Sequence, residues 1–284
     1  MGQLLKGKAV ADSISAKVKN EVEELKRNNI APKLKIVHIG EREDNLAYER
    51  AAVKRMNSLG ISCEILPLPA DIDSDTFAAE LKNVVNDHSV HGILLFRPLP
   101  EQINEDEIKF VICPEKDIDC FNPINAAKLL EGDDNGFPPC TARAALEILK
   151  FYNIQIEGRE TVVVGRSMVV GKPLSMMLLK ENSTVTICHS KTKDLPEVTK
   201  RADILIAAIG KSCMITKEYI KENAVVIDVG INADNEDKIT GDVDTDDCIG
   251  KAGFITPVPA GVGSVTTAVL ADHVVKACKL INKK

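Results

Sequence analysis

A short helical stretch near the N-terminus contains an aromatic residue and an alanine at a spacing that would place them on one face. YERAAVKRMNSLG (48–60) has helical periodicity, and Tyr48 and Ala52, four residues apart, would face the same volume. The ring of Tyr48 offers a flat surface for stacking on an aromatic ligand. The methyl group of Ala52 can neither give nor take a proton. If this volume is an active site, Ala52 therefore contributes no chemistry to it.

A second pattern, TVVVGRSMVVGKPLSMMLLKEN (161–182), reads as a strand, a glycine turn and a helix. Gly165 ends the strand, and Gly171 with Pro173 opens the helix, where proline is tolerated in the first turn. Free backbone N–H groups and the helix dipole at such a turn favour a pyrophosphate. The spacing is GxSxxxGxP and not the usual GxGxxG, so a tight turn without a ligand remains the alternative.

The end of the next strand indicates which dinucleotide would bind. An Asp or Glu about 20 residues past the turn holds a free ribose 2′-hydroxyl, whereas a 2′-phosphate requires cations and hydroxyls. Here the chain reads CHSKT, with Ser190 and Lys191 and no carboxylate, and Arg166 in the turn adds a second cation. The pattern favours NADP, and NAD is still possible. For Lys191 the simpler alternative is a surface lysine exposed to solvent.

The elements that would position these residues alternate along the chain. Apolar runs typical of strands stand between helical segments in the order βαβαβ, which favours a parallel sheet with helices on both faces. The predicted strands are 33–40, 62–69 and 90–100, and the predicted helices are 11–28, 45–60 and 74–87.

A second α/β series follows the loop at 131–140. It starts with a predicted helix at 141–153 and ends with a long amphipathic helix at 264–283, which could pack on either domain. Its predicted strands are 161–165, 183–189, 202–210 and 224–231.

Composition limits the class of protein. A 284-residue chain with 44% hydrophobic residues buries a large core and usually forms two domains. The net charge of −6 and the lack of a basic patch argue against a nucleic-acid partner. No apolar run approaches the ~18 residues that cross a membrane. The eight cysteines form no CxxC pair, which predicts reduced thiols in a cytoplasmic protein, without disulfides or a metal site.

Several stretches together resemble one family, the bifunctional methylenetetrahydrofolate dehydrogenase/cyclohydrolase (FolD-like) family of one-carbon metabolism. The resemblance is collinear over essentially the whole chain, and GDVD and TPVPxGVG are specific to it. The matching stretches are HGILLFRPLP (91–100), PEKDIDCFNPIN (114–125), VVVGRSMVVGKPLSMMLL, TICHSKT, VVIDVGIN (225–232), GDVD (241–244) and TPVPAGVGSVT (256–266).

The resemblance implies a two-domain α/β enzyme with the folate in a cleft between the domains. Residues 1–140 plus 264–284 would form the catalytic domain, and residues 141–263 the Rossmann-like NAD(P)-binding domain. Such enzymes oxidise 5,10-methylenetetrahydrofolate to the 5,10-methenyl form, and most then hydrolyse that cation to 10-formyltetrahydrofolate. They are typically cytosolic homodimers.

The resemblance also assigns roles to residues. Tyr48 would stack on the folate, and Asp119 would hold the pterin, whose N–H and amino group suit one carboxylate; we treat both as catalytic. The loop lining the folate would be Pro259, Ala260, Gly261, Val262 and Gly263. The cofactor residues would be Gly165, Arg166, Ser167, Ser190 and Lys191, with Ile231 beside the nicotinamide.

Two departures from the family pattern bear on activity. Ala52 stands where the family has a lysine, and Phe96 stands where a glutamine supports it; both, with the adjacent Arg97, would line the folate site. Lys54 cannot replace the lysine, because six residues from Tyr48 correspond to about 240° of rotation. Changes at Ala260 and Ser264 are smaller.

These departures predict an oxidoreductase that has lost the second reaction. Hydrolysis needs positioned proton-transfer groups, whereas hydride transfer chiefly needs the substrate held against the cofactor. Two alternatives stay open. The chain could be bifunctional through another cation, such as Arg55 or Arg97, or it could be a catalytically silent regulator that binds folate or nucleotide.

Overall fold

The computed structural model describes residues 2–233 and 239–283, which fold into two compact units. The three-stranded unit contains Ser13–Pro138 and the residues from Thr267 onward. The six-stranded unit contains the residues up to Asp12 and Pro139–Thr266. The boundaries after 138 and 266 lie within three residues of the predicted ones.

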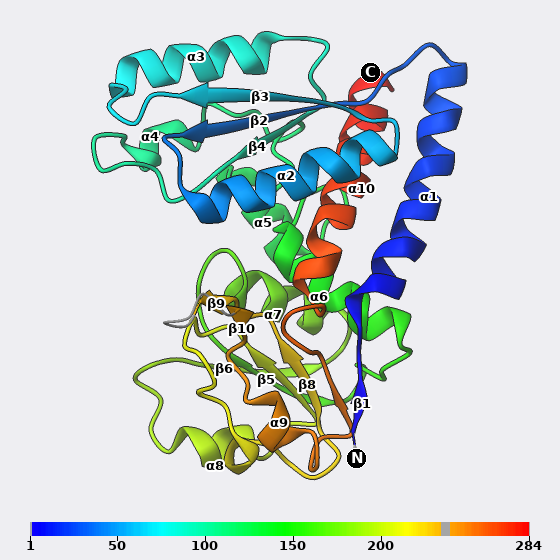
Figure 1. Cartoon of the computed structure of the whole chain (residues 1–284), viewed down its shortest axis with the longest axis vertical. Helices are drawn as coiled ribbons and strands as arrows, with labels where there is room; N and C mark the ends of the chain where they lie inside the picture. Colours follow the sequence, from blue (N-terminus) through cyan, green and yellow to red (C-terminus); the bar gives the residue numbers. More distant parts are fainter. Residues whose placement is uncertain (1, 234–238, 284) are drawn as a thin grey trace. The chain divides into compact units, whose positions relative to one another are not determined.

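The three-stranded unit is built on a parallel sheet, as the βαβαβ pattern predicts. Its strands β2 (Lys33–Ile39), β3 (Ser62–Leu68) and β4 (Gly92–Leu95) pair in the order β3-β2-β4. The connecting helices α2 (Glu43–Ser58) and α3 (Ser74–Asn86) cover opposite faces of the sheet (Figure 1). Strand β4 ends before the predicted residue 100, because Pro98 and Pro100 have no N–H to donate to a ladder.

Packing of helix α3 shows how the sequence builds this core. Phe77, Leu81 and Val84 recur at helical spacing and are buried against the sheet. The side chain of Asp73 accepts a hydrogen bond from the Thr76 N–H at 2.8 Å, which satisfies a free donor of the first turn. The core therefore forms on one stripe of the helix.

Four further helices complete the three-stranded unit. They are α4 (Glu105–Ile108), α5 (Pro123–Glu131), the part of α1 (Gly7–Arg27) from Ser13 onward and the part of α10 (Gly263–Asn282) from Thr267 onward. Helices α1 and α10 lie side by side (Figure 1) and are joined by the ion pairs Lys17–Asp272 and Lys279–Glu21, both at 3.0 Å. The C-terminal helix thus packs in this unit.

The six-stranded unit is a fully parallel sheet in the order β1-β11-β8-β7-β5-β6. Strands β7 and β8 are buried along their whole length, which explains their continuous apolar sequences. The strands are β1 (Gln3–Leu4), β5 (Glu160–Val164), β6 (Thr184–Cys188), β7 (Ile204–Ala207), β8 (Val225–Asp228) and β11 (Phe254–Ile255).

Short helices and a small ribbon surround this sheet. The helices are α6 (Cys140–Phe151), α7 (Gly171–Lys180), α8 (Leu195–Thr199), the 3₁₀ turn η1 (Lys217–Tyr219) and α9 (Thr245–Cys248). The ribbon pairs β9 (Asn232–Ala233) with β10 (Ile239–Thr240) in antiparallel fashion.

One predicted boundary differs from the structure at the N-terminus. The sequence places residues up to 140 in the first domain, but the residues up to Asp12 belong to the six-stranded unit. The reason is backbone pairing, because Gln3 and Leu4 lie beside Phe254 and Ile255 in parallel register. Strands of two residues carry too little pattern to be predicted.

Candidate active site

The glycine turn after β5 is folded as tightly as its sequence predicts. Gly165 has φ of 139°, and a Cβ there would collide with the carbonyl oxygen of Ala208. A Cβ on Gly171 would likewise collide with the carbonyl oxygen of Gly165, so both positions require glycine. The hydroxyl of Ser167 accepts the N–H of Val170 at 3.1 Å, and α7 then begins at Gly171.

A pocket of about 280 Å³ opens at the carboxyl ends of β5, β6 and β7. Strand β5 lies between β6 and β7, so the chain leaves β5 towards one neighbour and later returns on its other side. Ligands of doubly wound sheets bind at such a switch point. The lining residues are Val164, Gly165, Arg166, Ser167, His189, Ser190, Leu195, Ala208, Ile209, Lys211 and Met214.

The lining of this pocket fits a phosphorylated ribose. It holds the cations Arg166 and Lys211 and the hydroxyls of Ser167 and Ser190, and none of its lining residues is a carboxylate. The predicted cofactor residues Gly165, Arg166, Ser167 and Ser190 are thus brought together. Such a lining suits a 2′-phosphate, which an adjacent Asp or Glu would repel.

Lys191 and Lys211 differ from the sequence expectation in opposite ways. Lys191 is exposed, is not among the lining residues, and donates its backbone N–H to Nδ1 of His189 at 3.1 Å. Lys211 was not predicted but lines the pocket. It follows Gly210 at the carboxyl end of β7, and position at the end of a parallel strand is the signal that could have identified it.

Asp242 of the GDVD stretch binds the loop after β7 that lines this pocket. Its buried carboxylate accepts the backbone N–H groups of Ile209, Gly210 and Lys211 at 2.5, 3.1 and 2.9 Å. Asn232 donates to the same carboxylate at 3.0 Å. The aspartate fixes the loop after β7, so its role is to shape the pocket.

Asp228 anchors Asp242 in turn. Its buried carboxylate accepts the N–H groups of Gly230, Asp242 and Val243 at 2.9 to 3.0 Å. Burial raises the pKa of Asp228 to about 6, although these hydrogen bonds oppose the rise. The VVIDVGIN and GDVD stretches are therefore two halves of one buried network.

A second pocket of about 220 Å³ gathers the predicted folate loop and Ile231. Pro259, Ala260, Gly261, Val262 and Gly263 all line it, as Ile231 does. Ala260 has φ of 78°, a left-handed conformation that an L-residue adopts at a cost. Its carbonyl accepts the N–H of Gly7 at 2.8 Å, which holds the loop in place.

In the three-stranded unit, Tyr48 packs beside Phe96. The ring centroids lie 5.9 Å apart with an interplanar angle of 53°. Tyr48 is partly buried, Phe96 is 8% exposed, and Ala52 has no exposed surface at all. The side chain four residues after Tyr48 is therefore a buried methyl group, and the Tyr48 ring itself packs against another aromatic ring.

The nearby cations are engaged elsewhere. Arg55 donates from Nε to Thr267 at 3.4 Å and from Nη1 to Ser15 at 3.1 Å. Arg97 lies 5.2 Å from the centroid of the Phe121 ring, with its Nη1 3.9 Å from Glu105.

The two aspartates of the KDID stretch have separate roles. Asp117 is buried and accepts the N–H groups of Phe121 and Asn122 and the side-chain amide of Asn125 at 2.8 to 2.9 Å. Burial raises its pKa above the ordinary value. Asp119 is partly exposed. Asp117 thus shapes the turn before α5, and of the two carboxylates only that of Asp119 belongs to a residue with appreciable exposed surface.

Within the described residues, no three His, Cys, Asp or Glu side chains are grouped so as to hold a metal ion. In the same part of the chain, no helix has the length and apolar character that crossing a membrane demands. The eight cysteines, all in that part, are free thiols.

A glycine turn and a cationic pocket at the switch point of a parallel sheet define a nicotinamide-dinucleotide-binding protein. Residues 139–282 match the NAD(P)-binding domain of tetrahydrofolate dehydrogenase/cyclohydrolase, and residues 5–119 match its catalytic domain. The chain belongs to the tetrahydrofolate dehydrogenase/cyclohydrolase family, which confirms the resemblance and the two-domain α/β fold.

Individual relatives agree over the full length. The bifunctional protein FolD of Alkaliphilus oremlandii is 60% identical over 280 residues, which cover 99% of this chain and 98% of that protein. The bifunctional FolD structure from Campylobacter jejuni is 38% identical with a TM-score of 0.96, and each chain is fully covered.

A third relative bears on the cofactor. The Trypanosoma brucei enzyme, solved with NADP and an inhibitor, is 32% identical with a TM-score of 0.94, and the match covers 100% of this chain and 99% of that one. Together with the matched NAD(P)-binding domain, it confirms NADP as the predicted cofactor.

Proposed function

We propose that this protein oxidises 5,10-methylenetetrahydrofolate to 5,10-methenyltetrahydrofolate with NADP and has little or no cyclohydrolase activity. Bound NADP supplies the hydride acceptor. The observation that supports the missing second reaction is the wholly buried Ala52, one helical turn after Tyr48, whose ring packs beside Phe96.

Different residues of the chain would bind the folate and the cofactor. Tyr48 offers its ring face to the folate, and Asp119 accepts the pterin N–H and amino groups in a bidentate pair. The loop from Pro259 to Gly263 lines the pocket that it shares with Ile231. Arg166 and Ser190 bind the phosphorylated ribose.

Hydrolysis would fail for lack of a proton carrier. Enzymatic hydrolysis of the methenyl cation beyond the rate in buffer needs a water that a positioned side chain activates, and loss of such a group costs about 10²–10⁴-fold in rate. Ala52 and Phe96 supply none, Lys54 is exposed, and Arg55 is bound to Thr267. Oxidation gains from the same change, because the substrate becomes positively charged and a nearby ammonium would oppose it.

A bifunctional enzyme is the second candidate, favoured by the bifunctional relative that is 60% identical over the full length. A cation such as Arg97 would then have to leave Glu105 and Phe121. A silent folate- or nucleotide-binding regulator is the remaining candidate, and it would bind NADP in the same cationic pocket without transferring a hydride.

We also propose a homodimer. Strand β6 is an edge of its sheet, and Leu179 and Ile187 are exposed large apolar residues on it and on the preceding helix. An unpaired edge flanked by apolar side chains suits pairing with a second copy about a two-fold axis.

The first test of the function is oxidation itself. Purified protein with methylenetetrahydrofolate and NADP should form NADPH and the methenyl product in equal amounts, and NAD in place of NADP should support a lower kcat/KM. Cofactor binding without turnover would favour the silent regulator instead.

A further inference from the structure

A buried ion pair joins strand β2 to helix α2 in the three-stranded unit. His38 Nε2 lies 3.3 Å from Glu49 Oε2, and the two residues are only 5% and 8% exposed. The other ring nitrogen, Nδ1, lies 2.8 Å from the carbonyl oxygen of Gly40. Nothing in the proposed reaction uses either side chain.

Two contacts orient the His38 ring. The carbonyl of Gly40 can only accept a hydrogen bond, so Nδ1 is the donor to it and Nε2 faces Glu49. Oε2 has no hydrogen-bond partner in the described part of the chain, so the contact with His38 is what compensates its burial.

The pair is connected to Tyr48 through the ring of Phe96. The centroids of His38 and Phe96 lie 6.4 Å apart, and those of Phe96 and Tyr48 lie 5.9 Å apart. The Phe96 N–H donates to the carbonyl of Val37 at 3.0 Å, which sets its backbone beside β2. Glu49 follows Tyr48 on α2, and the contacts run from Glu49 through His38 and Phe96 to Tyr48.

We propose that His38 and Glu49 are positioning residues for Tyr48, holding its ring at the folate through Phe96. This inference rests on the proposed function, in which Tyr48 stacks on the folate. Because the pair sits behind Phe96 and is buried, it acts on orientation and exchanges no proton with the substrate.

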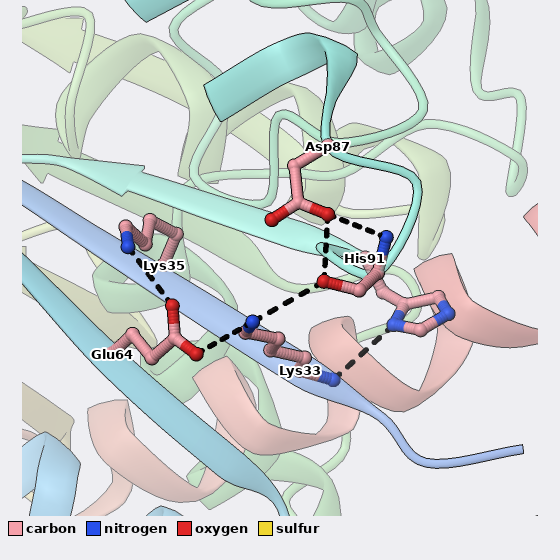
Figure 2. Close-up of polar contacts among 6 residues, drawn as sticks. Lys33, Lys35, Glu64, Asp87 and His91 are labelled. Carbon is pink, nitrogen blue, oxygen red and sulfur yellow. Dashed lines mark hydrogen bonds and ion pairs between the residues drawn. The ribbon is translucent and has the colours of Figure 1, made fainter. Parts of the chain in front are cut away.

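A matched control lies at the other end of the same sheet. His91 is 7% exposed and stands before β4, where its Nδ1 accepts the N–H of Lys33 at 3.3 Å. Figure 2 shows His91 in a separate polar group, in which Glu64 pairs with Lys33 and Lys35 at 2.6 and 2.9 Å. Removing the imidazole of His91 perturbs the sheet but leaves the rings of His38, Phe96 and Tyr48 in place.

The test compares His38→Ala, Glu49→Ala, Glu49→Gln and His91→Ala. Each alanine at 38 or 49 should raise the KM for methylenetetrahydrofolate about fivefold to tenfold, the loss expected when an aromatic contact is misplaced, and leave the KM for NADP unchanged. Glu49→Gln should stay within twofold of the parent, since its amide can donate to Nε2. His91→Ala should lower thermal stability only.

Three outcomes would overturn the inference. They are an unchanged folate KM in both alanine variants, an equal rise in His91→Ala, and a failure of Glu49→Gln to restore the parent value. If an alanine variant does not fold, Phe96→Leu removes the connecting ring and keeps the pair, and an unchanged folate KM there would count equally against it.

Tyr48→Ala, measured in parallel, separates this inference from the proposed function. An unchanged folate KM in Tyr48→Ala would remove the proposed binding site itself. A raised KM in that variant, with unchanged values in His38→Ala and Glu49→Ala, would overturn the positioning role alone.

Discussion

Arg55 of α2 donates from Nε to the hydroxyl of Thr267 on α10 at 3.4 Å. The same guanidinium reaches Ser15 on α1 at 3.1 Å, so it ties three helices together. A cation used in this way is not free to activate water beside Tyr48. The side chain one turn after Tyr48 remains the methyl group of Ala52.

Restoring the family residues should therefore restore hydrolysis. We expect Ala52→Lys with Phe96→Gln to raise methenyltetrahydrofolate hydrolysis at least about tenfold, part of the 10²–10⁴-fold that a general acid–base group supplies. Ala52→Lys alone should gain less and should be destabilised, because a buried ammonium without a partner is costly. The assay is the decay of methenyl absorbance.

Ala51→Lys is the control for the first prediction. Ala51 is exposed on the same helix, so this variant adds the same charge on the solvent side. Hydrolysis that rises equally in Ala51→Lys, or stays flat in the double variant, would show that position 52 does not decide the second reaction.

The cofactor pocket makes a prediction about specificity. Arg166→Gln and Lys211→Gln should each raise the KM for NADP by about 10- to 100-fold, because hydrogen bonds to charged groups are worth about 1.5–3 kcal/mol. The KM for NAD should change by less than about twofold if both cations bind the 2′-phosphate. Steady-state kinetics with both nicotinamides measures this.

Lys191 provides the comparison for that prediction. It is exposed and does not line the pocket, so Lys191→Gln should have the smallest effect of the three. If Arg166→Gln or Lys211→Gln raises the KM for NAD as much as the KM for NADP, the replaced cation binds the pyrophosphate and not the 2′-phosphate. A larger effect at Lys191 than at Lys211 would reverse our assignment.

Much of the fold follows from the sequence, because its main signals are local. The strands β2 and β3 and the crossover helices α2 and α3 lie within three residues of their predicted bounds, since apolar periodicity decides each of them. The turn at Gly165 was also recognisable, because glycine there meets a steric need.

The missed features are pairings between separate elements. The pairing of Gln3 with Phe254 joins two strands of two residues that are far apart in the sequence. The His38–Glu49 pair joins a residue of a predicted strand to a glutamate on the polar face of a predicted helix, and the sequence singles out neither of them. Partners of this kind are chosen by tertiary packing, which local pattern does not record.

Ala260 should be a site of backbone strain. Its φ of 78° costs an L-residue about 1–2 kcal/mol, and glycine adopts it freely. Ala260→Gly should raise the free energy of unfolding by about 0.5–1 kcal/mol after the greater entropy of unfolded glycine is subtracted. Thermal melts of the two proteins measure this, and a lower melting temperature for the variant would contradict it.

Asp228 should make stability depend on pH. Its pKa is raised from 3.8 to about 6 in the folded state, so the folded protein binds the proton more tightly. This contribution to stability is complete below about pH 4 and is lost as pH rises through 6. Between pH 5 and 7 the loss is about 1 kcal/mol.

Asp228→Asn tests that titration. The amide does not titrate, so the stability of the variant relative to the parent should improve by about 1 kcal/mol from pH 5 to pH 7. Urea unfolding at the two pH values gives the comparison. A difference that is the same at both would mean that Asp228 stays ionised throughout this range.

The dimer proposal predicts a specific surface. Ile187→Lys on the edge strand β6 should convert dimers to monomers in sedimentation experiments, because a lysine opposes edge pairing. Ile65→Lys, which changes an equally exposed isoleucine on the edge strand β3 of the other sheet, should leave the assembly intact. A monomeric parent, or a dimer that survives Ile187→Lys, would contradict the proposal.

The most direct measurement follows the absorbance of methenyltetrahydrofolate in two samples, one with the purified protein and one with buffer alone. We expect the methenyl absorbance to decay equally fast in both samples. The same protein preparation should oxidise methylenetetrahydrofolate with NADP, which shows that it is active. Rapid conversion to 10-formyltetrahydrofolate by the unmodified chain would show that a group other than the side chain at position 52 handles the proton, and would contradict the account.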